Sequence, residues 1–126
     1  MNYVFPIYRI PVLYVAGTED VFPIHRVYCV GQNYSDHMYE MGSNPERDAP
    51  FFFSKPADAV FFNQNSKISY PSKTKKLHHE IELVVAIGEK GENISKSEAH
   101  KHVFGYTVGL DLTRRDLQLE AKKKGR

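Results

Sequence analysis

The sequence lacks most features of secreted, membrane-bound or nucleic-acid-binding proteins. Its single cysteine, Cys29, cannot form an intramolecular disulfide, which fits a reducing compartment. No apolar run is long enough to span a bilayer, and the N-terminus lacks the basic start and apolar stretch of a secretion signal. The net charge of +2 is too small to favour nucleic acid or an anionic membrane as a partner. We therefore expect a cytoplasmic protein with no nucleic-acid partner and no membrane partner.

Two common catalytic motifs are also missing, the glycine-rich phosphate loop and the nucleophile elbow. Cys29 stands in an apolar run without a histidine at catalytic spacing, so we interpret it as a structural thiol. The hydrophobic share of 41% and charged share of 25% are ordinary for a globular chain. A length of 126 residues predicts a single domain, residues 1–126, with one core.

The pattern of apolar runs and turn residues predicts a mostly β protein of the α+β class. Strands are expected at HRVYCVG (25–31), FFFSKPADAVFF (51–62, broken at Pro56), HHEIELVVAIG (78–88) and VFGYTVGL (103–110). Ser95 and Glu98 form a capping-box pattern that predicts a helix to about His102. Thr113 and Asp116 resemble a capping pair for a last helix that Gly125 would end.

The strongest predicted strand carries two glutamates near its start. Glu80 and Glu82 are two residues apart, so their side chains point to the same face of a strand. The residues that face the other way, from Ile81 to Ile87, are all apolar, and we expect this strand to be buried on both faces. Two packed carboxylates repel each other unless a cation or a proton intervenes. A hard cation resolves this conflict, and oxygen ligands favour Mg²⁺, Mn²⁺ or Ca²⁺ over zinc.

The spacing of the glutamates has a second interpretation, in which both carboxylates are solvated at a frayed strand end. Asp111 follows the next apolar run, where a third carboxylate could converge with the pair or could cap the following helix. His78 and His79 could be metal ligands, although orienting the strand or facing solvent is the simpler interpretation. These alternatives stay open from spacing alone.

His37 and Glu40 form another pair, three residues apart on a predicted short helix. Side chains at this spacing share a helix face and interact. A carboxylate that orients an imidazole can make a general base for water, but an ordinary surface pair fits the same pattern.

Four segments in order carry a resemblance to one family. They are VYCVGQNYSDHMYEMG, PFFFSKPADAV, LHHEIELVVAIG and GYTVGLDLTRRDLQLEAKKKG. Residues 22–126 resemble the fumarylacetoacetate hydrolase family, nearest its fumarylpyruvate hydrolases and acylpyruvases. The resemblance implies a mixed β-roll, a homodimer and a divalent cation, Mg²⁺ or Mn²⁺ with Ca²⁺ possible. It also implies a small 2,4-dioxo acid substrate whose carbon–carbon bond is hydrolysed, with fumarylpyruvate giving fumarate and pyruvate.

The resemblance also implies roles for eight side chains. The metal carboxylates are Glu80, Glu82 and Asp111. The pair that activates water is His37 with Glu40. The residues near the substrate are Lys55, Arg115 and Gln118.

The sequence departs from the family pattern in two places. Gln32 stands where relatives commonly carry arginine, which bears on the identity of the substrate. The sequence stops at KKKGR, whereas relatives continue with a comparable stretch that supplies a catalytic lysine and further strands. We therefore expect an incomplete domain, truncated at the C-terminus, with unpaired sheet edges and part of its core open. Alternatives are a catalytically incomplete metal-binding module, a subunit of a split enzyme, or a family decarboxylase or isomerase.

Overall fold

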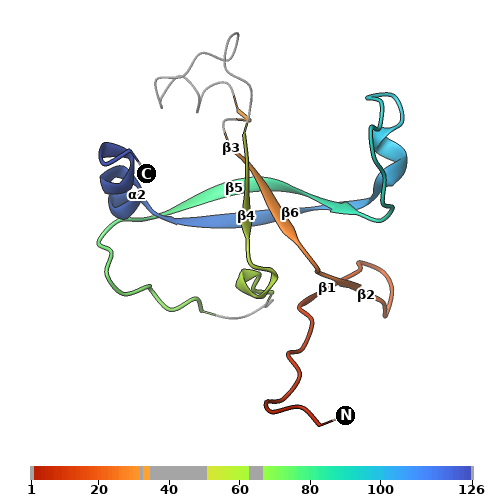
Figure 1. Ribbon diagram of the computed structural model, residues 1–126, viewed down its shortest axis with the longest axis horizontal. Helices are drawn as coiled ribbons and strands as arrows, with labels where there is room; N and C mark the ends of the chain where they lie inside the picture. Colours follow the sequence, from red (N-terminus) through yellow and green to blue (C-terminus); the bar gives the residue numbers. More distant parts are fainter. Residues whose placement is uncertain (1, 32, 35–50, 63–66, 126) are drawn as a thin grey trace. The chain divides into compact units, whose positions relative to one another are not determined.

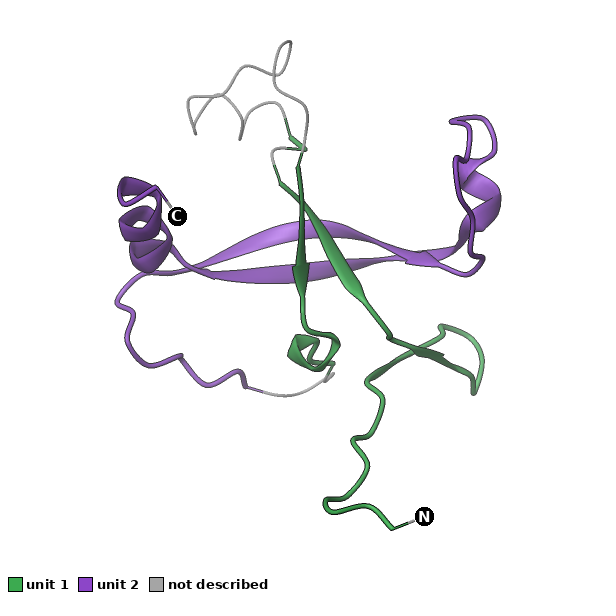
Figure 2. Ribbon diagram, in the orientation of Figure 1, with its two compact units in different colours: residues 1–66 green, residues 67–126 purple. Residues whose placement is uncertain are grey.

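The computed structural model describes residues 2–31, 33–34, 51–62 and 67–125. The chain divides into two compact units, residues 1–66 and residues 67–126 (Figure 2), and each is described by itself. The described residues form three antiparallel two-stranded sheets, two short 3-10 helices and one α-helix (Figure 1). This mostly β composition confirms the predicted α+β class. Within the same residues, no helix has the length and apolar character needed to cross a bilayer.

The first unit begins with a short hairpin. β1 (Val12–Tyr14) pairs with β2 (Val21–Pro23), with Leu13 opposite Phe22. Gly17 in the connecting turn has a φ of 77°, a left-handed conformation that glycine adopts at little cost. After the hairpin, Ile24 is the only buried hydrophobic side chain among the described residues, at 7% exposed.

A second hairpin in the same unit contains the apolar run around Cys29. β3 (Val27–Gly31) pairs with β4 (Phe51–Lys55), from Val27 opposite Lys55 to Gly31 opposite Phe51. β4 ends before Pro56, which has no N–H group for a strand ladder, and the 3-10 helix η1 (Ala57–Ala59) follows. The break predicted at Pro56 is confirmed, and strand structure does not resume at residues 60–62.

The second unit is built on one long β-ribbon. β5 (Leu77–Ile87) pairs with β6 (Val103–Arg114), and the register is irregular only between Ala86 and Ile87. The 3-10 helix η2 (Ala99–His102) precedes β6 at one end of the ribbon, and helix α2 (Arg115–Lys123) follows it at the other (Figure 1). The strands predicted at residues 78–88 and 103–110 are confirmed, and the second continues to Arg114.

The helix predicted from Ser95 is shorter than the capping pattern suggested. The carbonyl of Ser95 accepts hydrogen bonds from the N–H groups of Glu98 and Ala99, so a turn forms there. Only η2 follows, and no side chain caps it. The hydroxyls of Ser95 and Ser97 bond to each other instead, so the serine does not act as the expected cap.

The two faces of the β5–β6 ribbon differ in chemistry and exposure. The face that carries Glu80 and Glu82 is half-buried along β5. The opposite face, called here the apolar face, is exposed and consists of Ile81, Leu83, Val85, Ile87, Phe104, Tyr106, Val108 and Leu110. Exposure there runs from 43% at Val85 to 71% at Val108. The expectation of burial on both faces is therefore wrong for this chain, because the alternation shows only that a face is apolar.

Helix α2 begins one residue later than the predicted capping pair requires. Thr113 lies inside β6, and the residue at the N-cap position is Arg114, without a side-chain capping bond. The predicted cap by Thr113 is therefore wrong. At the other end Gly125 has a φ of 69°, as expected for a glycine that terminates a helix.

Asp116, in the first turn of α2, ties the helix to the segment before β5. Its carboxylate accepts hydrogen bonds from the hydroxyl of Thr74 and from the backbone N–H groups of Lys75 and Leu117. The Thr74 bond is the largest cause that lowers the pKa of Asp116 below its usual value of 3.8, followed by the Lys75 bond. The ionised carboxylate therefore stabilises this junction.

The lowered pKa of Asp116 predicts a specific acid sensitivity. A carboxyl whose pKa is lower in the folded state contributes stability above its unfolded pKa, and that contribution is lost as the pH falls through the folded pKa. Asp116→Asn should therefore lose less stability than the wild-type chain as the pH falls below about 4. Urea unfolding at a series of pH values measures the slope of the unfolding free energy against pH. Asp58→Asn, which removes a carboxylate from the first unit, should keep the wild-type slope, and identical slopes in all three chains would contradict the assignment.

Candidate metal and substrate site

The register of the β5–β6 ribbon brings three carboxylates to one face. Glu80 lies directly opposite Asp111, and Glu82 lies directly opposite Gly109. Side chains of directly opposed residues in an antiparallel pair project to the same side of the sheet. Glu80, Glu82 and Asp111 therefore share the half-buried face. Glu80 and Asp111 lie toward the end of the ribbon that leads into α2, and Glu82 lies nearer its middle.

The donor chemistry of this face suits a hard divalent cation. Its three acidic side chains offer only oxygen atoms, which Mg²⁺, Mn²⁺ and Ca²⁺ prefer. In the part of the chain that the structure describes, no three His, Cys, Asp or Glu side chains are gathered as a group that could hold an ion. The backbone thus places suitable donors on one face, and the side chains do not converge on a common point.

Glu80 interacts with a cationic side chain from helix α2. Its Oε1 atom is ion-paired with the guanidinium of Arg115 and also accepts a 3.4 Å hydrogen bond from the Thr113 hydroxyl. The Arg115 side chain is 14% exposed and that of Glu80 is 28% exposed. Water therefore screens this pair less than it screens the exposed ion pairs of the same unit.

Two further side chains hold the Arg115 guanidinium. Its Nε donates to Nδ1 of His78 at 3.3 Å, and its Nη1 donates to Oε1 of Gln118 at 2.7 Å. The structure thus brings together the expected substrate residues Arg115 and Gln118 with the expected metal carboxylate Glu80. His78 was not assigned this role from the sequence, although its position two residues before Glu80 places it on the same strand face.

The other expected site residues lie elsewhere. Lys55 ends β4 in the first unit and lines a hollow of about 290 Å³ with His25, Tyr28 and Ser54 among others. His37 and Glu40 fall outside the described residues, so their assignment as a water-activating pair stays a prediction.

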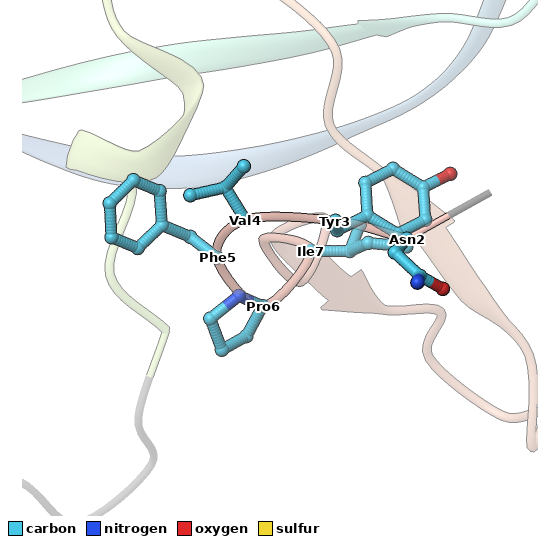
Figure 3. Close-up of a pocket in the computed structure, with 6 residues that line it drawn as sticks. All are labelled: Asn2, Tyr3, Val4, Phe5, Pro6 and Ile7. Atoms are coloured by element: carbon cyan, nitrogen blue, oxygen red, sulfur yellow. The ribbon is translucent and has the colours of Figure 1, made fainter.

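A second hollow lies near the N-terminus and contains none of these residues. It is lined by six consecutive residues, from Asn2 to Ile7 (Figure 3). Phe5 and Pro6 point outward from the bend of the chain and not toward each other (Figure 3). A bend made by one short segment offers no set of converging groups, so it is not a candidate active site.

Gly109, opposite Glu82, leaves room for a methyl group of Val84. A Cβ atom at this position would lie 2.8 Å from Cγ2 of Val84, a side chain with little χ1 freedom. We predict that Gly109→Ala costs about 1–3 kcal/mol of unfolding free energy, the usual range for overpacking. Chemical denaturation measures the change. Gly105→Ala on the same strand is the matched control, because within the described structure nothing lies within 4 Å of its Cβ position. Equal stabilities of the two variants would contradict the predicted clash.

Comparison with known proteins identifies the family of this chain. Residues 26–126 match the family described as fumarylacetoacetate (FAA) hydrolase C-terminal. The structure is similar to the crystal structure of fumarylpyruvate hydrolase from Pseudomonas aeruginosa in complex with Mn²⁺ and pyruvate, with a TM-score of 0.92 and 49% sequence identity. That similarity covers 99% of this chain and 55% of the other chain.

Two curated relatives are named as oxaloacetate tautomerases and not as fumarylpyruvate hydrolases. Oxaloacetate tautomerase FAHD1, mitochondrial, of Mus musculus is 43% identical over 99 residues, which are 79% of this chain and 44% of that protein. Oxaloacetate tautomerase YisK of Bacillus subtilis is 41% identical over 102 residues, which are 80% of this chain and 34% of that protein. The chain spans about half, or less, of the length of these relatives. The matched family and these identities show that the chain belongs to the fumarylacetoacetate hydrolase family.

Proposed function

We propose that this chain forms part of a divalent-metal-dependent hydrolase that cleaves a carbon–carbon bond of a 2,4-dioxo acid, with fumarylpyruvate as the substrate. The observation that carries the proposal is the register of the β5–β6 ribbon, which places Glu80, Glu82 and Asp111 on one face. The 49% identity to a fumarylpyruvate hydrolase studied with Mn²⁺ and pyruvate supports this choice of substrate.

The three carboxylates would hold Mg²⁺ or Mn²⁺, with Ca²⁺ as a further possibility, because they supply only oxygen donors. The bound cation supplies Lewis-acid polarisation at the 2-oxo acid end of the substrate. Arg115 and Gln118 would bind a carboxylate of the substrate, since a guanidinium matches a carboxylate in both charge and geometry. Lys55 would be a further contact to the substrate.

The bond cleavage requires a proton acceptor and an attacking water. Glu40, oriented by His37, would take a proton from water, whose oxygen then bonds to the distal carbonyl carbon. The bond between that carbon and the neighbouring CH₂ carbon breaks, and its electron pair stays on the pyruvate fragment. Protonation of that fragment gives pyruvate, and the acyl fragment leaves as fumarate, so all atoms of substrate and water are accounted for.

Oxaloacetate tautomerisation is the second candidate, because the mouse and Bacillus subtilis relatives bear that name at 41–43% identity. This reaction moves one proton between carbon and oxygen and needs no attacking water. The same carboxylates and Arg115 would serve it. Decarboxylation of oxaloacetate is a related outcome, since a relative from Dictyostelium discoideum is named oxaloacetate decarboxylase.

A non-catalytic module is the alternative from another functional class. One observation favours it: the apolar face of the ribbon is exposed within the described residues. Such a module would bind the cation, or pair with a second polypeptide, without turning over substrate.

Two absorbance assays separate these candidates. The chain is incubated with Mn²⁺ and either fumarylpyruvate or the enol form of oxaloacetate, and the loss of each absorbance is followed. We expect loss of fumarylpyruvate that disappears in a Glu80→Ala, Glu82→Ala chain. Loss of enol oxaloacetate alone would instead identify a tautomerase or a decarboxylase of oxaloacetate. Mn²⁺ binding without turnover of either compound would identify the non-catalytic module.

Assembly and location complete the proposal. We propose a cytoplasmic homodimer that acts in the breakdown of aromatic compounds, in keeping with the fumarylpyruvate substrate. The mouse relative is named as mitochondrial, so location differs within the family. Light scattering coupled to size exclusion would measure the mass of the particle, and a monomer would contradict the dimer.

A further inference from the structure

Arg115 and a divalent cation would share one carboxylate, that of Glu80. The Oε1 atom of Glu80 already accepts the guanidinium of Arg115, and it also accepts the hydroxyl of Thr113. A guanidinium and a dication on one carboxylate repel each other, and the low exposure of both side chains leaves little water to screen that repulsion.

We propose that Arg115 competes with the cation for Glu80, so that cation binding frees the guanidinium to take an anionic group of the substrate. This inference rests on the proposed metal site. It deepens the proposed function by coupling the two ligands: the cation must displace Arg115, and the displaced Arg115 then forms part of the substrate site. A substrate carboxylate replaces Glu80 as the acceptor for the same guanidinium.

His78 and Gln118 define where the guanidinium rests. His78 accepts from Nε and Gln118 accepts from Nη1, which leaves the remaining nitrogen for Glu80. These two acceptors come from different elements, β5 and α2, and each bonds the guanidinium that pairs with Glu80. They hold the side chain in place without adding charge, so His78 is a positioning residue for Arg115 and not a ligand of the cation.

The test measures Mn²⁺ affinity of the full chain by isothermal titration calorimetry, without any substrate. Arg115→Met should bind Mn²⁺ roughly tenfold more tightly than the wild-type chain, within the usual range of coupling between two sites. Arg114→Met removes the same charge from the adjacent, exposed position and should change the affinity by less than about twofold. His78→Leu should increase the affinity by a smaller factor than Arg115→Met, whereas loss of a metal ligand would decrease it.

A second readout follows Arg115 itself. The side-chain Nε–Hε resonance of Arg115 is identified in an NMR spectrum by its absence from an Arg115→Lys chain. Addition of Mg²⁺, which is diamagnetic, should shift this resonance as the guanidinium leaves Glu80. The backbone amide spectrum of each variant shows whether the chain remains folded.

The outcomes separate this inference from the proposed function. Tighter Mn²⁺ binding by Arg115→Met together with a shifted Arg115 resonance supports the competition. Binding of Mn²⁺ that is unchanged or weakened in Arg115→Met, or an Arg115 resonance that Mg²⁺ leaves in place, overturns the competition alone. If neither the wild-type chain nor Arg115→Met binds Mn²⁺, the metal site fails, and the proposed function is overturned with the inference.

Discussion

Glu82→Gln is expected to weaken Mn²⁺ binding by this chain at least about 100-fold, since even partners outside the ligand set cost 10- to 100-fold when removed. The substitution removes a negative charge and one anionic oxygen donor from the face shared with Glu80 and Asp111. It leaves the Arg115–Glu80 pair in place, so the effect reports on the cation and not on that pair. Titration calorimetry or the electron paramagnetic resonance signal of free Mn²⁺ measures the affinity.

Glu120→Gln is the matched control for this measurement. Glu120 lies on α2 in an exposed ion pair with Lys124, so the same chemical change occurs away from the carboxylate face. We expect wild-type Mn²⁺ affinity from this variant, because a solvent-exposed charge acts weakly over distance. Similar losses in both variants would show that net charge and not ligation by Glu82 determines binding.

Arg115→Gln is expected to lower kcat/KM for fumarylpyruvate by about 100-fold or more. Charge-assisted hydrogen bonds contribute about 1.5–3 kcal/mol each, and 1.4 kcal/mol corresponds to a factor of ten. Loss of the guanidinium fork that would bind a substrate carboxylate therefore has a large effect. Steady-state kinetics at saturating Mn²⁺ measures it, so that any change in metal affinity does not enter the comparison.

Two companion variants test the reason for that loss. Arg115→Lys keeps the charge but not the planar fork, and we expect it to recover only a small part of the activity. Arg114→Gln, in the exposed adjacent position, should retain wild-type kinetics. Full activity in Arg115→Lys would show that a positive charge alone suffices and that the fork geometry is not used.

Much of the carboxylate face could be predicted from the sequence, because alternation within a strand is a local property. The two-residue spacing of Glu80 and Glu82 was enough to place them on one face. The pairing of Glu80 with Asp111 depends on the register between strands about thirty residues apart, which local patterns do not specify. The resemblance to the family identified Asp111 as a partner, and the register shows its position opposite Glu80.

The start of helix α2 explains why the ion pair was not predicted. The capping pattern at Thr113 placed the helix one residue early, whereas β6 continues through Arg114. Strand pairing with Leu77 continues to Arg114 and takes precedence over the local capping preference. Arg115 is consequently the first residue of the helix, next to the ribbon, where its side chain meets Glu80 and His78.

The burial of the strand faces was predicted less well than the positions of the strands. The apolar residues from Ile81 to Ile87 indicate a face that would be stabilised by packing, but not which segment would pack against it. Within the described residues that face is exposed. A sequence pattern therefore identifies apolar faces more reliably than it identifies what covers them.

The arrangement of the ribbon has a consequence for folding order. The three carboxylates, His78, Arg115 and Gln118 all lie within residues 78–118, on two strands that are consecutive in the sequence and on the helix that follows them. Contacts between neighbouring elements close short loops and form quickly. The acidic face and its arginine therefore come from one continuous stretch of sequence, so their assembly needs no strand from outside that stretch.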